Sequence, residues 1–212
     1  SMGTFGEDCA AKYGFTRAEQ DAFATASVER AKAATASGAF AAEITPVTVK
    51  SRAGETVVSV DEGPGKVKLD KIASLKPAFK KDGTITAASS SSINDGAAAL
   101  VMMRASTATK LGCKPLARIV GHATHAQEPE WFATAPLGAT QKALAKAGWA
   151  VGDVDLWEIN EAFAVVPMAL MKELNLPHDK VNVNGGACAL GHPIGASGAR
   201  IMVTLIYALQ AR

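Results

Sequence analysis

The second half of the chain alternates strand-like and helix-like segments, and this order constrains the fold more than any other feature of the sequence. Strands are predicted at residues 116–126, 154–160 and 180–186, and the helices that follow them at residues 138–149, 162–174 and 197–209. Strands that are joined through helices form a parallel sheet covered on both faces. We therefore predict an α/β fold, with the last helix, apolar nearly all round, buried inside it.

The first half of the chain carries helix and hairpin signals. Thr16 and Glu19 form a capping-box pattern and Gly38 is a stop signal, so residues 16–36 are predicted to be helical. Alternating apolar residues predict two short strands within residues 43–60, with the turn at residues 53–55.

The middle of the chain is less regular. Residues 69–79 favour a short helical stretch, and the polar, serine-rich residues 81–96 are either a linker or a site loop. Residues 97–112 favour a helix, or a strand followed by a helix. Because Gly112 and Pro115 end this stretch, we place a domain border near Lys114.

Composition narrows the class of protein. With 212 residues, 48% of them hydrophobic, the chain can bury a sizeable core. Its 22 basic and 20 acidic residues are spread along the sequence, which argues against a nucleic-acid partner. No apolar run approaches the roughly 20 residues that span a bilayer, and the N-terminus lacks signal-peptide features, so we expect a cytoplasmic protein without membrane contact. Three widely spaced cysteines indicate free thiols and no metal site.

Two segments that follow predicted strands carry the candidate chemistry. Asn160 lies in INEAF and His192 in GGACALGHPIG, and both are expected at the same edge of the sheet, where ligands gather. A histidine can act as a base or a donor near neutral pH, and an amide can stabilise a developing oxyanion. The alternative interpretation is that His192 is a structural loop histidine and the surrounding glycines only make turns.

The residues around this pair resemble the thiolase family, the acetyl-CoA acetyltransferases. The resemblance rests on NEAFA at residues 160–164 and VNVNGGACALGHPIGASGAR at residues 181–200, and it extends to residues 1–27 and 84–101. It implies incomplete duplicated βαβαβαββ sheets covered by helices, plus a loop domain. By this resemblance, residues 1–92 are most of the loop domain, 93–114 the last helix and strand of the N-terminal domain, and 115–212 a C-terminal domain that lacks its last strands.

The resemblance implies acyl transfer between thiols and carbanions. Two acetyl-CoA condense to acetoacetyl-CoA and CoA, or CoA cleaves a 3-ketoacyl-CoA, with coenzyme A thioesters as substrates, no further cofactor, and a homodimer or homotetramer as the assembly. By the same resemblance His192 activates an acylated cysteine and donates to the thioester oxygen, and Asn160 positions a water beside it. The residues matched to the coenzyme A channel are Phe163, Ser91, Phe79, Ala87 and Met2.

The sequence departs from the family pattern at the catalytic cysteines. Cys9, Cys113 and Cys188 each lie in the wrong context for either family cysteine, although Cys188 stands four residues before His192. We therefore expect this chain to be a fragment, inactive alone, whose bare apolar faces favour association. Ser89 replaces a more usual asparagine, and Ser1 a more usual histidine.

Two other functions stay open at this point. The chain could be a non-catalytic acyl-CoA-binding or scaffolding protein that retains the pocket residues without a nucleophile. A decarboxylating ketosynthase on the same fold is the weaker alternative, because that relative typically uses two histidines and lacks the loop domain. Intact His192 and Asn160 favour an enzyme, since a binding protein has no need of an oxyanion hole.

Overall fold

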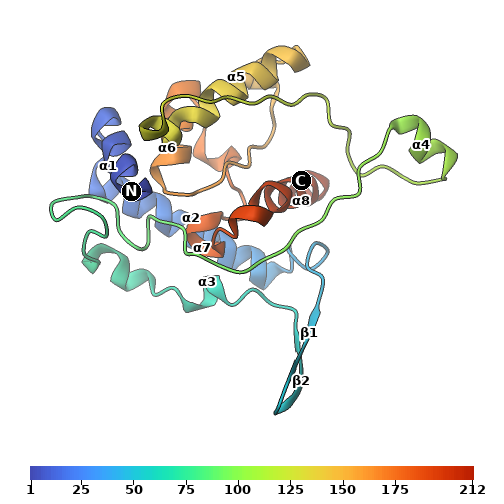
Figure 1. The fold of residues 1–212 in the computed structure, drawn as a ribbon, viewed down its shortest axis with the longest axis horizontal. Coiled ribbons are helices and arrows are strands. Elements are labelled where there is room, and N and C mark those ends of the chain that lie inside the picture. Colours follow the sequence, from blue (N-terminus) through green and yellow to red (C-terminus); the bar gives the residue numbers. More distant parts are fainter.

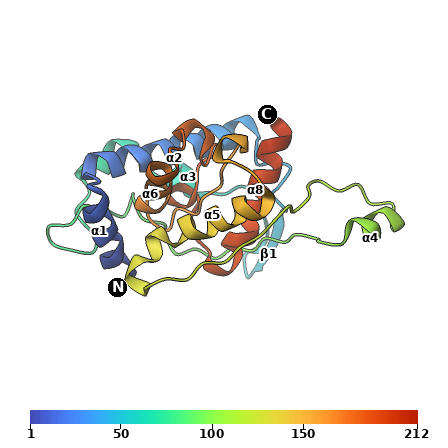
Figure 2. The same cartoon turned by 90° about the horizontal axis from the view of Figure 1, so that it is seen from above.

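The computed structural model describes all residues from 1 to 212 and shows a helical body from which two parts project (Figures 1 and 2). One projection is the hairpin of β1 (Val47–Ser51) and β2 (Gly54–Val58), and the other is a long loop that carries α4 (Ala105–Lys110). The other α-helices are α1 (Met2–Tyr13), α2 (Arg17–Ser37), α3 (Gly63–Lys66), α5 (Ala135–Ala147), α6 (Val165–Leu174), α7 (Ala187–Leu190) and α8 (Ile194–Ala211). Short 3-10 turns complete the chain at η1 (Leu69–Ser74), η2 (Pro129–Thr134), η3 (Val151–Asp153) and η4 (His178–Lys180).

The signals for α2 act as the sequence predicts. The Thr16 hydroxyl accepts a hydrogen bond from the Glu19 amide at 3.2 Å, and the Glu19 carboxylate accepts one from the Thr16 amide at 2.7 Å. Gly38 ends the helix in the left-handed conformation at φ 78°, which costs glycine little. The predicted helix at residues 16–36 is therefore confirmed to within one residue at each end.

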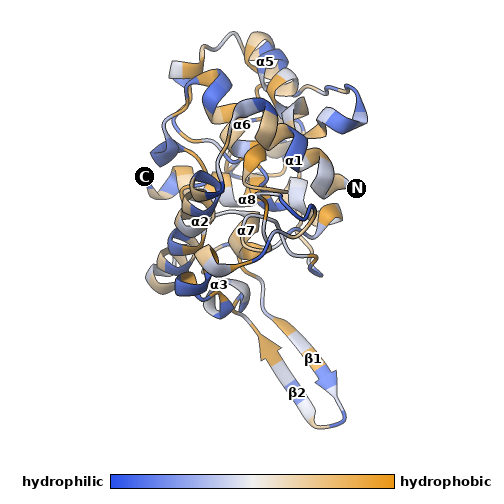
Figure 3. Ribbon diagram, turned by 90° about the vertical axis from the view of Figure 1, so that its left-hand side faces the viewer, coloured by the Kyte–Doolittle hydropathy of each residue, from blue (hydrophilic) through white to orange (hydrophobic).

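The predicted hairpin is also confirmed. Val47 pairs with Val58 and Ser51 with Gly54 in an antiparallel register, and every residue of both strands is exposed. The turn falls at residues 52–53 rather than 53–55, because Gly54 already belongs to β2. Figure 3 shows that the apolar positions of these strands lie away from the body.

The predicted parallel strands meet only briefly. Trp157 and Val181 form a parallel bridge, in which the Trp157 amide donates to the Lys180 carbonyl at 2.8 Å and the Asn182 amide to the Trp157 carbonyl at 2.9 Å. The Asn182 side chain takes the place of the next pair of backbone hydrogen bonds: its Oδ1 accepts from the Ile159 amide and its Nδ2 donates to the Ile159 carbonyl, both at 2.8 Å. Asn182 leaves the extended conformation at φ 47°, so the pairing stops there.

The predicted strand at residues 116–126 is wrong as a hydrogen-bonded element. Residues 114–127 make no backbone–backbone hydrogen bond, and neither do residues 93–103 on the other side of α4. A strand requires a neighbouring backbone, and no other strand of this chain lies beside either segment. For residues 97–112 the helical part of the prediction holds at α4, which begins at Ala105, whereas the alternative of a preceding strand is wrong because residues 97–103 make no backbone hydrogen bond.

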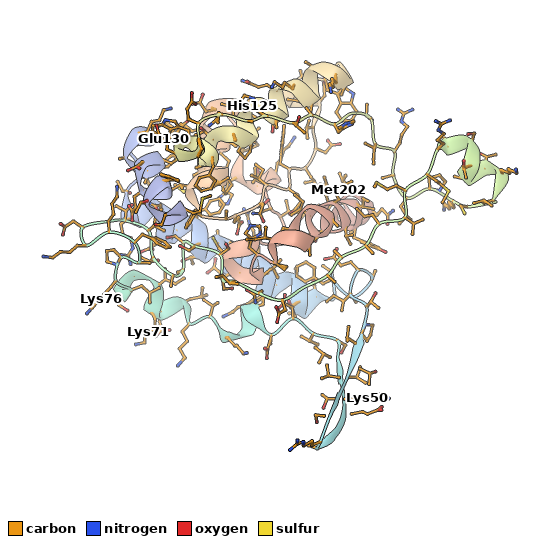
Figure 4. The ribbon with its side chains drawn as sticks, in the orientation of Figure 1. Lys50, Lys71, Lys76, His125, Glu130 and Met202 are labelled. Atoms are coloured by element: carbon orange, nitrogen blue, oxygen red, sulfur yellow. The ribbon has the colours of Figure 1, made fainter.

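The prediction that the last helix is buried is wrong. Only Ala196, Ser197, Thr204 and Ala208 of α8 are buried, whereas Met202 of this helix, labelled in Figure 4, is exposed. Burial of a helix depends on the elements around it, which its own sequence does not specify. By length and composition α8 could cross a membrane, a test that the core helix of a soluble protein also passes.

The main hydrophobic cluster lies where α1, α6 and η2 meet. It joins Cys9 and Ala10 of α1 to Val165, Val166 and Ala169 of α6, with Ile85, Ala133 and Phe163 between them. A second cluster of Ile159, Leu170, Leu176 and Val181 packs beneath the parallel bridge. The polar residues 81–96, the site loop, are anchored to the body: Thr86, Ser89 and Ser90 are buried, and the Ser89 carbonyl accepts a hydrogen bond from the Ala164 amide at 2.9 Å. The segment is therefore not a free linker.

Candidate active site

Asn160 and His192 lie side by side, as the positions of their segments predict. The Asn160 Nδ2 and His192 Nε2 atoms are 3.5 Å apart, although 31 residues separate the two positions in the sequence. Asn160 follows the segment that forms the parallel bridge, and His192 immediately precedes Pro193 and α8. The Asn160 Oδ1 atom is buried without a hydrogen-bond partner.

The glycine next to His192 allows the site loop to approach closely. Gly191 has φ 82°, and a side chain there would collide with the Asn94 amide. The His192 amide donates to the Ser92 carbonyl at 3.0 Å, so the loop of residues 92–94 holds the main chain of His192 in place. An open hollow of about 390 Å³ lies beside these loops, lined by residues 94–98 and 193–196. His192 does not line it.

The imidazole is held from its other nitrogen by α8. His192 Nδ1 lies 2.6 Å from the Ser197 hydroxyl, and this hydroxyl also donates to the Pro193 carbonyl at 3.1 Å. Burial lowers the pKa of His192 below its ordinary value, and the positive charge of Arg200 lowers it further. The imidazole is therefore neutral at neutral pH and can accept a proton.

Glu161 is a functional candidate that the sequence reasoning missed. Its fully buried carboxylate accepts hydrogen bonds from the Ser27 hydroxyl at 2.7 Å, the Asn182 side-chain amide at 2.8 Å and the Cys188 backbone amide at 2.9 Å. It thus connects α2, the bridge segment and the loop that carries His192. An acidic residue inside the buried apolar stretch 159–166 was the available signal, because buried carboxylates require partners.

A second acidic group lies close to the site. The Glu158 carboxylate is 3.7 Å from Arg200 Nη1, and neither Glu158 oxygen has a hydrogen-bond partner. Burial raises the pKa of Glu158 to about 8 against the opposing charge of Arg200. Burial likewise raises the pKa of Glu43, which accepts a hydrogen bond from Thr204 of α8 at 3.2 Å.

The residues matched to the coenzyme A channel are only partly brought together. The buried Phe163 ring contacts Phe79 edge-on, with centroids 5.6 Å apart, and the Ser91 amide and hydroxyl both donate to the Ala162 carbonyl at 3.1 Å. Phe79 packs over Gly3, next to Met2 on α1. The Met2 side chain is half exposed and Ala87 is exposed on the site loop.

The three cysteines are free and lie in three different environments. Cys9 is buried in the main hydrophobic cluster, where burial raises its pKa to about 11. Cys113 is exposed in the loop after α4. The Cys188 thiol faces Glu161, and burial together with that carboxylate raises its pKa well above the ordinary value. None of the three thiols is therefore placed as a thiolate beside His192.

Comparison with known proteins gives a consistent result over the whole chain. The family model described as "Thiolase, N-terminal domain" matches residues 1–106, and "Thiolase, C-terminal domain" matches residues 113–212. The chain is 50% identical to an acetyl-CoA acetyltransferase of Paracoccus denitrificans and 53% identical to one of Chromobacterium violaceum. In both cases the match covers 100% of this chain and 54% of the relative.

Solved structures agree with the family models. The structure superposes on the Bacillus anthracis acetyl-CoA acetyltransferase with a TM-score of 0.96 and 47% identity, covering 100% of this chain and 54% of that one. It superposes on human mitochondrial 3-ketoacyl-CoA thiolase with a TM-score of 0.88 and 38% identity, covering 98% and 53%. The chain has the α/β fold of these proteins over the matched part, and it spans about half the length of the curated relatives that it matches.

Proposed function

Because the chain belongs to the thiolase family, we propose that its site serves acyl transfer between coenzyme A thioesters. The reaction would be the condensation of two acetyl-CoA to acetoacetyl-CoA, or the cleavage of a 3-ketoacyl-CoA by CoA. The observation that carries this proposal is the 3.5 Å approach of Asn160 Nδ2 to His192 Nε2. The pair offers a base and an amide donor at one point, which is what a thiol nucleophile and a developing oxyanion need.

In this proposal the neutral His192 acts as the base. Its Nε2 takes the proton of a cysteine thiol supplied from outside these 212 residues, and the thiolate attacks the carbonyl carbon of an acyl-CoA. The tetrahedral oxyanion then receives hydrogen bonds from the new His192 Nε2–H and from Asn160, directly or through a water. The carbon–sulfur bond to coenzyme A breaks, the acyl group stays on the cysteine, and the departing CoA thiolate takes the proton that His192 Nε2 holds.

The coenzyme A arm is proposed to approach along the face that Phe163 and Phe79 define. Their edge-on contact gives an apolar wall for the pantetheine chain, with Ser91 as a polar group beside Phe163 and with Met2 and Ala87 at the rim. We propose no further cofactor, a cytoplasmic location, and assembly as a homodimer or homotetramer.

Thiolysis of acetoacetyl-CoA by the complete polypeptide tests this function. We expect His192→Ala to lower the rate by roughly 10²–10⁴-fold through loss of the base, and Asn160→Ala by roughly 10²–10³-fold through loss of an oxyanion donor. CoA binding should change little in either variant. His122→Ala is the matched control, since this histidine is exposed and has no role in the proposed mechanism. Turnover that survives His192→Ala unchanged would refute the role of His192 as the base. CoA binding without any turnover by the complete wild-type polypeptide would favour the non-catalytic acyl-CoA-binding alternative.

A further inference from the structure

Ser197 is the one residue that contacts the far nitrogen of the His192 ring. It lies in the first turn of α8, is buried, and its Oγ is 2.6 Å from His192 Nδ1 and 3.1 Å from the Pro193 carbonyl oxygen. A hydroxyl has a single proton to donate, so only one of these two contacts can be a donation by Ser197. Where that proton lies decides the state of the imidazole.

The Pro193 carbonyl is an acceptor only. If Ser197 donates to it, as the geometry of that contact allows, the lone pairs of Oγ must accept from His192, and Nδ1 therefore carries a hydrogen. The resulting chain runs from Nδ1–H to the Ser197 hydroxyl and on to the Pro193 carbonyl. The Nδ1–H group and the Ser197 hydroxyl each donate to the next group in this chain, so neither proton is left without an acceptor.

The opposite edge of the ring leads independently to the same state. Asn160 turns its Nδ2, a donor, toward His192 Nε2. A donor facing Nε2 is favourable only if this nitrogen presents its lone pair, and a neutral imidazole with a bare Nε2 carries its hydrogen on Nδ1.

We propose that Ser197 is a positioning residue that holds neutral His192 in the Nδ1–H tautomer, with the Nε2 lone pair directed toward Asn160. The tautomer itself depends only on the contacts above, whereas its consequence for turnover rests on the proposed function. A base that acts through Nε2 needs a bare Nε2 before it reacts. After it takes the proton, the imidazolium keeps the same Nδ1–H bond to Ser197, so the ring need not turn between the two states.

Solid-state NMR of ¹⁵N-histidine-labelled protein, sedimented so that self-association does not interfere, tests the tautomer directly. With four histidines in the chain, the signals of His192 are assigned by their loss in His192→Gln. At a pH where His192 is neutral, we expect Nδ1 to be the protonated nitrogen and Nε2 the bare one. Ser197→Ala should shift the population toward Nε2–H, the form that free histidine prefers in water.

Thr204→Val is the matched control, because it removes another buried hydroxyl of α8 that contacts Glu43 and not His192. It should leave the tautomer unchanged. A protonated Nε2 in the wild-type protein would overturn the proposal even if Ser197→Ala failed to fold. An unchanged tautomer in a folded Ser197→Ala variant would overturn it equally.

A kinetic measurement separates this proposal from the proposed function. In the complete enzyme we expect Ser197→Ala to lower kcat for thiolysis at least about tenfold with little change in KM, because the wrong tautomer offers the thiol a proton instead of a lone pair. If the tautomer shifts and turnover does not, the Nδ1–H assignment stands and the role of His192 as base falls. If the wild-type tautomer is Nε2–H while His192→Ala still abolishes turnover, the role of Ser197 falls and the proposed function stands.

Discussion

The buried carboxylate of Glu161 should be the most sensitive single group around the site. Glu161→Ala would remove the acceptor of three buried donors, the Ser27 hydroxyl, the Asn182 side-chain amide and the Cys188 backbone amide. A buried donor without an acceptor costs about 1–3 kcal/mol, so the sum lies at about 3–9 kcal/mol. Water that enters the vacated space would satisfy part of this demand, which places the expected loss near the lower end, at about 3–4 kcal/mol.

Glu161→Gln provides a graded comparison. Glu161 Oε2 accepts two of the hydrogen bonds and Oε1 one, so a glutamine can keep its oxygen toward Ser27 and Cys188. Its NH₂ group then meets the NH₂ group of Asn182, and one bond is lost. We expect a loss of about 1–3 kcal/mol for this variant. Glu29→Ala, on an exposed position of α2 close to Ser27, should cost less than about 0.5 kcal/mol.

Urea unfolding followed by circular dichroism measures these differences. With a slope of about 1–3 kcal/mol per molar urea, a loss of 3–4 kcal/mol lowers the midpoint by about 1–4 M, a large part of the total stability of a typical domain. The order should be Glu161→Ala below Glu161→Gln, and Glu161→Gln below Glu29→Ala. If Glu161→Ala unfolds at the same urea concentration as Glu29→Ala, the carboxylate does not hold these three segments together.

Two further predictions concern titration and thiols. The pKa of Glu158 is raised to about 8 from about 4.5, so between these pH values the folded chain binds more protons than the unfolded chain and the free energy of unfolding falls as pH rises. Glu158→Gln should remove this slope and raise the urea midpoint at pH 8, and an identical slope in the variant would contradict the assignment. A disulfide-exchange reagent should modify one thiol per chain rapidly, Cys113, which is exposed, because Cys9 is buried with a raised pKa and the partly buried Cys188 has its pKa raised by desolvation and by Glu161. Cys113→Ser should abolish the fast phase, and a fast phase that persists would show Cys188 or Cys9 to be accessible.

Features with local causes could be predicted from the sequence. Thr16, Glu19 and Gly38 determine the ends of α2 through contacts within a few residues, and the β1–β2 hairpin needs only its own alternation and turn. The proximity of Asn160 and His192 could also be predicted, because each residue follows one of the two segments that pair in the parallel bridge of Trp157 and Val181.

Features that depend on distant partners could not be predicted. Residues 116–126 have strand-like character, but no other strand of this chain pairs with them. The helix α8 has an apolar surface that other elements of this chain cover only in part. The role of Glu161 was missed for a related reason, since its three donors come from three distant parts of the sequence. No period or motif indicates such a network before the chain is folded.

The central claim is that the His192–Asn160 pair performs acyl transfer only with a cysteine from outside these residues. The most direct test is thiolysis of acetoacetyl-CoA by a preparation whose intact mass is shown to be 21.8 kDa, the mass of the 212-residue chain. We predict no turnover above that of His192→Ala, because the Cys188 thiol faces Glu161, Cys9 is buried and Cys113 is in the loop after α4. Turnover by this chain that His192→Ala abolishes would contradict the claim, because the nucleophile would then lie within these 212 residues.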